Sequence, residues 1–418
     1  MNRQKIYAAT GMHRSMDICA VVLLIAILIS GIASCVSADR YRADHGVPPC
    51  EITASMDSLF GAIFKSGEPG AIVTVMRGDS IVYNHAFGLA RLDSVERVTD
   101  STLFNVSSVS KLFTGVALMK LSDEGILSLD DSLSKFFPTF PARYFDNITV
   151  RHVLSHRSGL PDLRPTTQAA WERYIATHRS VFGFDSDYRR YGTEAEHIRS
   201  FENLDSVDFP PGTHYDRRDI SYVLIAPLIE NVTGMDFDEW MRLNIFEPAG
   251  MTETFYYRQG VRRPRMAHGY RPVEPGMAAV GARSADGRWE EFDYGEADYF
   301  LTRADRGVFT SSRDFMKFKR ALKDGRIIRK ELIDSMLKPE IATYEEYVHF
   351  GLGSAVQRKP GFTMRPYHVN NNGGFAAIEC WWPECDIHYI VFSSRNGWDQ
   401  YHVMCKVDSL LASNGWIR

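Results

Sequence analysis

The sequence lacks the repeats, low-complexity tracts, basic stripes and zinc-site motifs that mark particular classes of protein. It has no low-complexity tract and no internal repeat, so repetitive and extended disordered architectures are excluded. It has no basic helix or aromatic-basic stripe, and its net charge is -4, so we expect no nucleic-acid partner. None of its 6 cysteines has zinc-site spacing with histidines, and we expect no metal and no cofactor. Its 418 residues suffice for two or three domains or for one large α/β unit.

The N-terminal segment lacks the length of a membrane span. Its apolar run at 18–29 follows several basic residues and is shorter than the about 20 residues that cross a bilayer. Small residues stand directly before Cys35, a pattern similar to the lipobox of bacterial lipoproteins, in which Cys35 would carry the lipid. Ordinary secretion with cleavage nearby and an uncleaved anchor are the alternatives. We predict a lipoprotein-type signal peptide at 1–35, a polar tether at 36–50, and lipid anchoring in the bacterial cell envelope, facing the periplasm or the exterior.

Few cysteines would remain in the mature chain. In an oxidising envelope compartment, Cys380 and Cys385 could bridge across the tip of a hairpin. Because spacing alone does not establish a disulfide, the sequence leaves their redox state open.

Strand-like and helical patterns alternate in blocks along the rest of the chain. Apolar residues recur at helical spacing over 52–64, and two β-rich runs at 70–76 and 81–87 are joined by a turn signal at Gly78. A long stretch that is mostly helical and loop-like follows. Near the C-terminus come three strand-like runs and one amphipathic stretch, at 350–356, 375–381, 387–393 and 403–411.

Hairpin strands at both ends, with helices between them, predict one antiparallel sheet assembled from both termini and flanked by helices. This is an α/β fold of the α+β kind with a mostly helical inserted lobe. We assign a single domain to 51–418, with a sheet lobe at 51–105 and 304–418 and a helical lobe at 106–303. An active site would lie in the crevice between the two lobes.

Ser108 and Lys111 form the most informative short motif. Residues three apart on a helix share a face, so the lysine amine can reach the serine hydroxyl. The apolar residues that follow, up to Gly125, predict a helix, and its N-terminal dipole would favour an oxyanion at Ser108. Taken alone, the motif is equally typical of a capping serine followed by a solvated lysine.

Further segments make the chain resemble a known family over nearly everything after Cys50. They lie at 69–71, 104–111, 124–125, 127–131, 154–161, 211–213, 230–234 and 247–251, with Thr254. Together they resemble the serine β-lactamase and penicillin-binding protein superfamily, closest to its class C β-lactamase-related branch, which includes Ser-x-x-Lys among its signatures. The resemblance implies a β-lactamase/transpeptidase-like fold, with Ser108 as the acylated nucleophile and Lys111 as its partner amine.

The second motif of that family, Tyr-x-Asn, is altered in this chain. An alignment without gaps from 211–213 onward puts Arg217 at the tyrosine and Asp219 at the asparagine, while Tyr215 fills a neighbouring aromatic position. Arginine does not act as a base in proteins. Arg217 near Lys111 would lower the pKa of the lysine and Asp219 would raise it, and the sequence leaves open which effect prevails.

The third motif, normally Lys/His-Thr/Ser-Gly on a strand lining the cleft, aligns with His368, Val369 and Asn370. By resemblance, His368 would face the carboxylate of a substrate, and Asn370 replaces a glycine against which substrate would lie. The backbone N–H groups of Ser108 and Asn371 would form the oxyanion hole.

These residues predict a serine hydrolase that acts through acyl-Ser108 on an amide or ester. The resemblance implies D-amino-acid peptides of cell-wall origin or small esters as substrates. Because Arg217, Asp219 and Asn370 depart from the family pattern, the alternative is a catalytically impaired binding or regulatory lipoprotein. A β-lactamase or DD-peptidase is disfavoured because the tyrosine is missing. The expected partners are a small-molecule or peptide substrate and, through the lipid anchor, a membrane, and the oligomeric state is left open.

Overall fold

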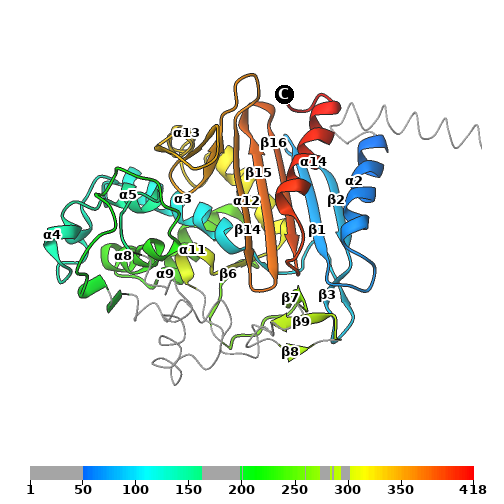
Figure 1. Cartoon of the computed structure of the whole chain (residues 1–418), viewed down its shortest axis with the longest axis horizontal. Helices are drawn as coiled ribbons and strands as arrows, with labels where there is room; N and C mark the ends of the chain where they lie inside the picture. The colour runs from blue at the N-terminus through cyan, green and yellow to red at the C-terminus, as the bar shows by residue number, and fades with distance from the viewer. Residues whose placement is uncertain are drawn as a thin grey trace, which may run out of the picture.

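The computed structural model describes residues 50–161, 198–199, 201–258, 260–273, 283–284, 287–292 and 302–418. The predicted signal peptide with Cys35, and the predicted tether up to residue 49, lie outside the described residues. Within the described ranges, no helix combines the length and the apolar character needed to cross a bilayer. Figure 1 shows a sheet with its covering helices on one side of the molecule and a mostly helical lobe on the other.

An eight-stranded antiparallel sheet forms the framework. Its strand order is β11-β12-β13-β14-β15-β16-β1-β2. The strands are β1 (Ala71–Arg77), β2 (Ser80–Phe87), β11 (Ile341–Ala342), β12 (Val348–Phe350), β13 (Ala355–Gln357), β14 (Arg365–Asn372), β15 (Phe375–Trp382) and β16 (Ile387–Ser393). β1 pairs with β16 along its whole length, from Ala71 opposite Ser393 to Arg77 opposite Ile387. The prediction of one sheet assembled from both ends of the chain is therefore confirmed.

The two faces of the sheet serve two different cores, because successive residues of a strand point to opposite sides. Ile72 and Ile390 pack toward the helical lobe with α3 and α12. Val73 and Val391 pack on the other face, beneath α2 and α14 (Figure 1). The bounds of these helices are α2 (Cys50–Ile63), α3 (Ser110–Asp123), α12 (Ser312–Lys323) and α14 (Gln400–Ser413).

The helical lobe is built from short helices that share one continuous core with the first face of the sheet. They are η2 (Leu133–Lys135), α4 (Ala142–Phe145), α5 (Val150–Leu154), η4 (Asp219–Leu224), α8 (Ile225–Thr233), α9 (Phe237–Met241), η5 (Arg242–Phe246), α10 (Glu247–Ala249), α11 (Arg303–Arg306) and α13 (Lys330–Met336). Three small antiparallel sheets complete the described fold: β5 (Phe104–Asn105) with β10 (Val308–Thr310) and β6 (Phe255–Tyr256), β3 (Leu89–Arg91) with β4 (Glu96–Arg97), and β7 (Gly269–Pro272) with β9 (Trp289–Phe292) and β8 (Arg283–Ser284).

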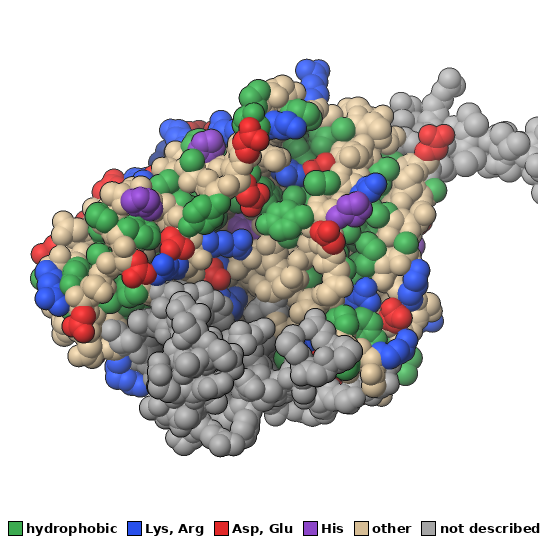
Figure 2. All heavy atoms as spheres, in the orientation of Figure 1, with side chains coloured by type: hydrophobic (Ala, Val, Ile, Leu, Met, Phe, Trp, Pro, Cys, Tyr) green, Lys and Arg blue, Asp and Glu red, His purple; other side chains and the backbone are tan. Residues whose placement is uncertain are grey.

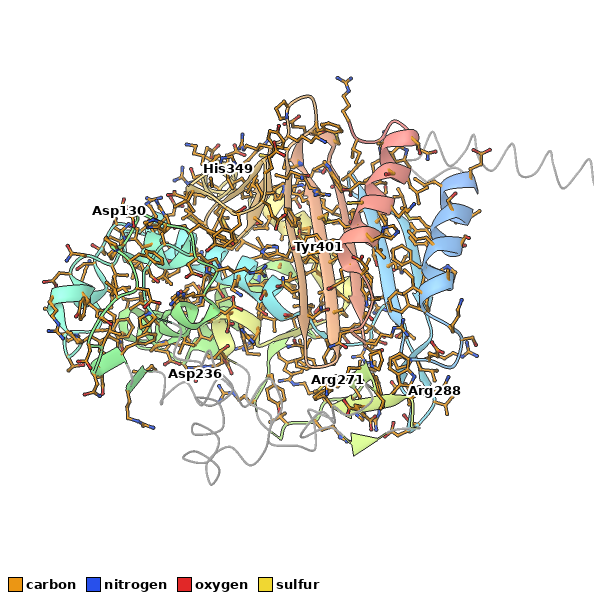
Figure 3. The ribbon with its side chains drawn as sticks, in the orientation of Figure 1. Asp130, Asp236, Arg271, Arg288, His349 and Tyr401 are labelled. Carbon is orange, nitrogen blue, oxygen red and sulfur yellow. The ribbon has the colours of Figure 1, made fainter. Side chains whose placement is uncertain are left out.

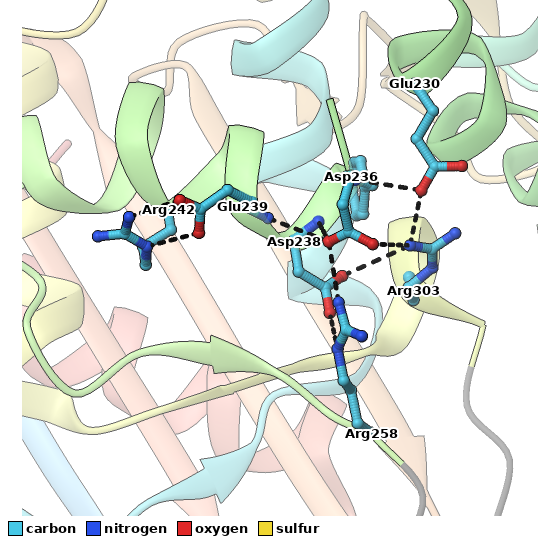
Figure 4. Close-up of polar contacts among 8 residues, drawn as sticks. Glu230, Asp236, Asp238, Glu239, Arg242, Arg258 and Arg303 are labelled. Carbon is cyan, nitrogen blue, oxygen red and sulfur yellow. Dashed lines mark hydrogen bonds and ion pairs between the residues drawn. The ribbon is translucent and has the colours of Figure 1, made fainter. Parts of the chain in front are cut away.

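A network of ion pairs holds the beginning of α9 (Figure 4). Asp236 caps the helix by accepting hydrogen bonds from two backbone N–H groups of its first turn. Arg258 donates to Asp238 at 2.7 Å and to Asp236 at 2.8 Å. Arg303 of α11 donates to Glu230 of α8 at 2.9 Å. We call these five residues the α9 network.

The predicted strand at 350–356 is wrong in its extent. β12 ends at Phe350 and β13 begins at Ala355, and a tight turn separates them. Gly353 in this turn has a φ of +95°, and a Cβ on Gly351 would lie 2.2 Å from the carbonyl oxygen of Met336. The backbone can reverse here only because both positions are glycine.

Cys380, Cys385 and Cys405 are free thiols. Cys380 lies on β15 in the core beneath α14, where burial raises the pKa of its thiol. Cys385 follows the strand in the short turn η6 (Pro383–Cys385). The bridge between Cys380 and Cys385 that the sequence left open is therefore not formed.

Candidate active site

Ser108 lies in a buried turn that leads directly into α3. It belongs to η1 (Ser107–Val109), and Ser107 adopts a left-handed φ of 50°. Asn105 accepts a hydrogen bond from the N–H of Ser107 at 3.0 Å and donates one to the carbonyl oxygen of Arg306 at 2.8 Å. Non-glycine residues rarely adopt such a φ, so the surrounding contacts hold a strained turn. The turn presents Ser108 at the junction of the two lobes.

Lys111 lies one helical turn after Ser108 and points back toward it. Its Nζ donates a hydrogen bond to Ser108 Oγ at 2.8 Å. Ser108 is 4% exposed and Lys111 is 2% exposed. Both line a cleft of about 750 Å³. The structure thus brings the two side chains together at the floor of a cleft, as the spacing of three residues predicts.

Aromatic side chains form much of the remaining cleft wall. They come from both lobes and are Tyr215, Tyr344, Phe350, Tyr367 and Tyr401. Tyr401, on the first turn of α14, is labelled in Figure 3 in front of the sheet. Figure 2 shows hydrophobic, basic and acidic side chains meeting where the helical lobe adjoins the sheet. The cleft therefore offers apolar walls with a few charged groups, which is the usual composition of a small-molecule site.

A cluster of charges surrounds the Lys111 amine. Its Nζ lies 2.9 Å from Asp219 Oδ1, and Asp219 Oδ2 accepts from Arg306 at 3.0 Å. Arg306 also donates to Asp305 at 2.8 Å. Arg217 is close enough to influence the titration of both Lys111 and Asp219. We call these five residues the floor cluster.

The structure resolves the competing effects that the sequence left open for Lys111. Burial lowers the pKa of Lys111, and Arg217 and Arg306 act in the same direction, so together they outweigh the opposing effect of Asp219 and Asp305. Burial alone would raise the pKa of Asp219, but Lys111, Arg306 and Arg217 hold it well below its usual range. Asp219 is therefore a stable anion, and Lys111 is the member of the floor cluster that can lose its proton most readily, because arginine stays charged.

No tyrosine of the described cleft wall has a lowered pKa, so none is suited to act as the base in place of the missing motif tyrosine. Burial raises the pKa of Tyr215 and of Tyr401. Burial also raises the pKa of Tyr222, whose hydroxyl donates to the carbonyl oxygen of Leu154 at 2.7 Å. Burial, with Lys111 as the next cause, lowers the pKa of His156 to about 3, so this ring is neutral. Lys111, beside Ser108, is therefore the side chain best placed to act as a general base.

Two of the three departures from the family motifs, Arg217 and Asn370, contact each other across the cleft. Arg217 precedes η4 on the helical lobe, and Asn370 lies on β14 of the sheet. A guanidinium nitrogen of Arg217 donates a hydrogen bond to Asn370 Oδ1. The alignment therefore predicted both positions in the cleft but not their contact, because they are separated by 153 residues.

His368 lines the cleft, but its ring is bound inside the protein. Nδ1 lies 3.0 Å from Glu379 Oε2, on the neighbouring strand, and Nε2 lies 2.8 Å from the carbonyl oxygen of Gly353. Lys319 of α12 donates to the other oxygen of Glu379 at 2.8 Å. Burial would raise the pKa of Glu379, but Lys319 and His368 hold it at about 2. Both ring nitrogens of His368 are therefore engaged by acceptor groups inside the protein.

The contact of His368 with a substrate carboxylate therefore stays a prediction that this geometry disfavours, since it would require one of these buried hydrogen bonds to break. The carbonyl oxygen of Asn371 accepts a hydrogen bond from Ser107 Oγ at 3.4 Å, so the end of β14 runs beside η1. The assignment of the N–H groups of Ser108 and Asn371 to an oxyanion hole also stays a prediction.

Several residues of this site could not be predicted from the sequence. Asp305 and Arg306 lie nearly 200 positions after Lys111, and Lys319 and Glu379 meet His368 only through the packing of α12 on the sheet. Only the cross-strand register, which opposes His368 to Glu379, could have indicated one of these contacts.

Among the described residues, one group brings metal-ligand types together: Asp93, His268 and Glu291, whose ligand atoms lie within 4.8 Å of one another. Asp93 already accepts from Arg91 at 2.7 Å. Glu291 Oε1 accepts from the Tyr270 hydroxyl at 2.6 Å and lies 2.7 Å from His268 Nδ1. Hydrogen bonds thus account for this cluster, and we infer no metal there.

An antiparallel sheet packed on helices, with a serine and a lysine on the first turns of the central helix, defines the class of serine hydrolases that use a serine-lysine pair. The family model "Beta-lactamase" matches residues 52–412, and the chain belongs to this family, within the serine β-lactamase and penicillin-binding protein superfamily. Its placement in the class C branch remains a prediction.

The sequence and structural similarity of this chain to individual proteins is consistent with this assignment. Penicillin-binding protein 4* of Bacillus subtilis is 26% identical over 326 residues, which cover 77% of this chain and 66% of that protein. The octameric penicillin-binding protein homologue of Pyrococcus abyssi is 25% identical with a TM-score of 0.69, covering 87% of this chain and 77% of that one. D-amino acid amidase of Ochrobactrum anthropi is 22% identical with a TM-score of 0.69, covering 87% and 99%. The last likeness shows the fold alone.

Proposed function

We propose that this protein is a serine hydrolase that acts through an acyl-Ser108 intermediate on an amide or ester. The observation that carries the proposal is the 2.8 Å hydrogen bond from Lys111 Nζ to Ser108 Oγ at the floor of a cleft. Membership of a family of serine hydrolases supports it.

Lys111 is the proposed general base. With Lys111 neutral, its amine accepts the proton from Ser108 Oγ while that oxygen bonds to the substrate carbonyl carbon. The resulting ammonium is stabilised by Asp219, 2.9 Å away, which stays ionised throughout. Lys111 then gives the proton to the leaving amine or alkoxide, and the same steps in reverse, with water as the nucleophile, release the acid.

The negative charge of the tetrahedral intermediate falls on the former carbonyl oxygen. We assign its stabilisation to the backbone N–H groups of Ser108 and Asn371, because η1 and the end of β14 lie together at the 3.4 Å contact between Ser107 and Asn371. The positive end of α3 acts in the same direction. An oxyanion donor is worth about 10²–10³ in rate, so this backbone device can support catalysis despite the altered side chains.

Labelling with an uncharged fluorophosphonate and a fluorescent penicillin, followed by intact mass, tests the proposal. We expect one adduct on the wild type and none on Ser108→Ala. The matched control is Ser409→Ala, which removes an exposed hydroxyl on α14 and should label like the wild type. If Ser108→Ala and wild type show the same profile, whether labelled or not, the acyl-Ser108 proposal is wrong.

One observation favours a second candidate, a binding or regulatory protein without turnover. Arg217, Asp219 and Asn370 depart from the family motifs, and the hydrogen bond from Arg217 to Asn370 joins the two sides of the cleft. Saturable binding of a cell-wall fragment that is unaffected by Ser108→Ala, with no adduct, would favour this candidate. A burst of product release would exclude it.

D-amino-acid peptides of cell-wall origin and small esters are the proposed substrate types. The likeness to a D-amino acid amidase supports the first of these, and the aromatic wall of the cleft suits a substrate with an apolar side chain. We also propose that Cys35 is lipidated and anchors the protein in the bacterial envelope. Incorporation of a labelled fatty acid that is abolished by Cys35→Ser, but not by Cys405→Ser, would support this anchor, and equal labelling of both would contradict it.

A further inference from the structure

Among the described residues, the two histidines that line the cleft, His156 and His368, are both buried and so are not accessible to a substrate anion. Both nitrogens of His368 are taken, by Glu379 and by the carbonyl oxygen of Gly353, and the ring is buried. Lys111 is equally unsuited, since it is buried and bound to Ser108 and Asp219. A negatively charged group in the cleft would therefore need another partner.

Arg217 is the cation that remains. Its side chain is exposed, it lines the cleft together with Ser108, and among the described residues it donates a hydrogen bond to the neutral amide oxygen of Asn370. It forms no ion pair with any residue that the structure describes. A guanidinium has five N–H donors in a fixed fork, so donors remain for a bidentate contact with a carboxylate or phosphate.

The charges around Arg217 also favour an anionic ligand. On the sheet wall opposite Arg217, the carboxylate of Glu379 is bound by both Lys319 and His368, so it leaves no unpaired negative charge there. Glu345 lines the cleft too, on the loop between β11 and β12, where it accepts from the Tyr367 hydroxyl at 3.2 Å. An anionic end near Glu345 would be repelled, so the charges favour one orientation of the ligand.

We propose that Arg217, held by Asn370, binds an anionic group of the substrate, so that the enzyme acts on acyl compounds ending in a carboxylate or a similar oxyanion. This inference rests on the proposed hydrolase function and specifies the substrate class. In this proposal the residue that binds the substrate anion is Arg217 on the helical lobe, and not His368 on strand β14. The hydrogen bond to Asn370 Oδ1 fixes the guanidinium plane and leaves its other edge for the ligand.

Two matched thioesters provide the probe: one whose leaving group ends in a carboxylate, and one whose leaving group ends in a carboxamide. For the wild type we expect kcat/KM to favour the carboxylate form. In Arg217→Gln both rates fall, because Arg217 also acts on Lys111, but the carboxylate-to-carboxamide ratio should fall about 10- to 100-fold, the usual effect of a charge-assisted hydrogen bond. Arg217→Lys should keep part of the ratio. The control, Arg326→Gln, removes an exposed arginine on the turn after α12 and should leave the ratio unchanged.

Fluorophosphonate labelling separates this inference from the function on which it rests. If wild type and Arg217→Gln both form the Ser108 adduct but share one substrate ratio, the anion site is refuted and the hydrolase stands. If the wild type forms no adduct and turns over neither thioester, the hydrolase itself is refuted. A wild type that prefers the carboxamide form would likewise overturn the anion site.

Discussion

The floor cluster and the α9 network are both groups of carboxylates and basic side chains in the helical lobe, but they differ in what they can do. In the α9 network every basic group is an arginine, and Arg258 is 58% exposed. The floor cluster contains a lysine that is 2% exposed and hydrogen-bonded to a serine. Arginine holds its charge, whereas burial and neighbouring cations lower the pKa of Lys111. A reactive ionic cluster is thus marked by a buried titratable amine beside a nucleophile, rather than by its number of charges.

Replacing the amine should have the largest effect. Lys111→Met keeps the length and burial of the side chain but removes the base, so we expect acylation of Ser108 to slow by about 10²–10⁴. Asp219 keeps Arg306 as a partner at 3.0 Å, so the fold should survive, which thermal unfolding checks. Stopped-flow or time-resolved intact mass gives the rate. A loss of less than a few-fold in a folded variant would place the base elsewhere.

Breaking the buried cluster of Lys319, Glu379 and His368 should lower the stability of the fold and leave the proton transfer at Ser108 unchanged. Glu379→Gln leaves the buried amine of Lys319 without its carboxylate and removes the ionised partner of His368. Removing one partner of a buried pair typically costs about 3–5 kcal/mol. Denaturant unfolding should show this loss, while Lys319→Met in the same background should restore part of it by removing one cation. An unchanged unfolding midpoint would contradict the assigned charges.

Asp219→Asn should shift the pH dependence of acylation without abolishing it. Asp219 raises the pKa of Lys111, so its removal lets that pKa fall further. The base form then appears at lower pH, and the acidic limb of the acylation profile moves to lower pH. Arg306→Gln should move the limb the opposite way, because Arg306 lowers the pKa of Lys111. Shifts in the same direction for both variants would contradict the electrostatic account.

The α9 network should show the smallest effect. Arg258→Gln removes two exposed ion pairs, and such pairs contribute about 0–1 kcal/mol to stability. We expect a small drop in the unfolding temperature and an acylation rate within about twofold of the wild type. A large loss of activity would show that the α9 network and the floor cluster are coupled.

The sequence predicted the parts of the molecule that depend on local spacing. The Ser108–Lys111 contact follows from residues three apart on a helix, and the two terminal hairpins follow from strand patterns. The alignment placed Arg217 and Asp219 in the cleft because the segment around them has the length the family requires.

Contacts between distant segments were not predictable in this way. The bond from Arg217 to Asn370 and the binding of His368 by Glu379 and Gly353 depend on how β14 packs against its neighbours. The break between β12 and β13 was missed because residues on both sides continue a strand-like pattern, while the turn depends on close backbone contacts at Gly351 and Gly353. The family resemblance therefore identified the positions that line the cleft. Only the packing of the strands shows that the ring of His368 is already hydrogen-bonded inside the protein.

The pH dependence of the rate at which an uncharged fluorophosphonate labels Ser108 shows whether Lys111 is the general base. Lys111 has a pKa lowered by burial, so the rate should rise along a single titration that ends below the usual lysine range of about 10.4, and this titration should disappear in Lys111→Met. A rate that is independent of pH, or a titration that persists in Lys111→Met, would show that Lys111 is not the base.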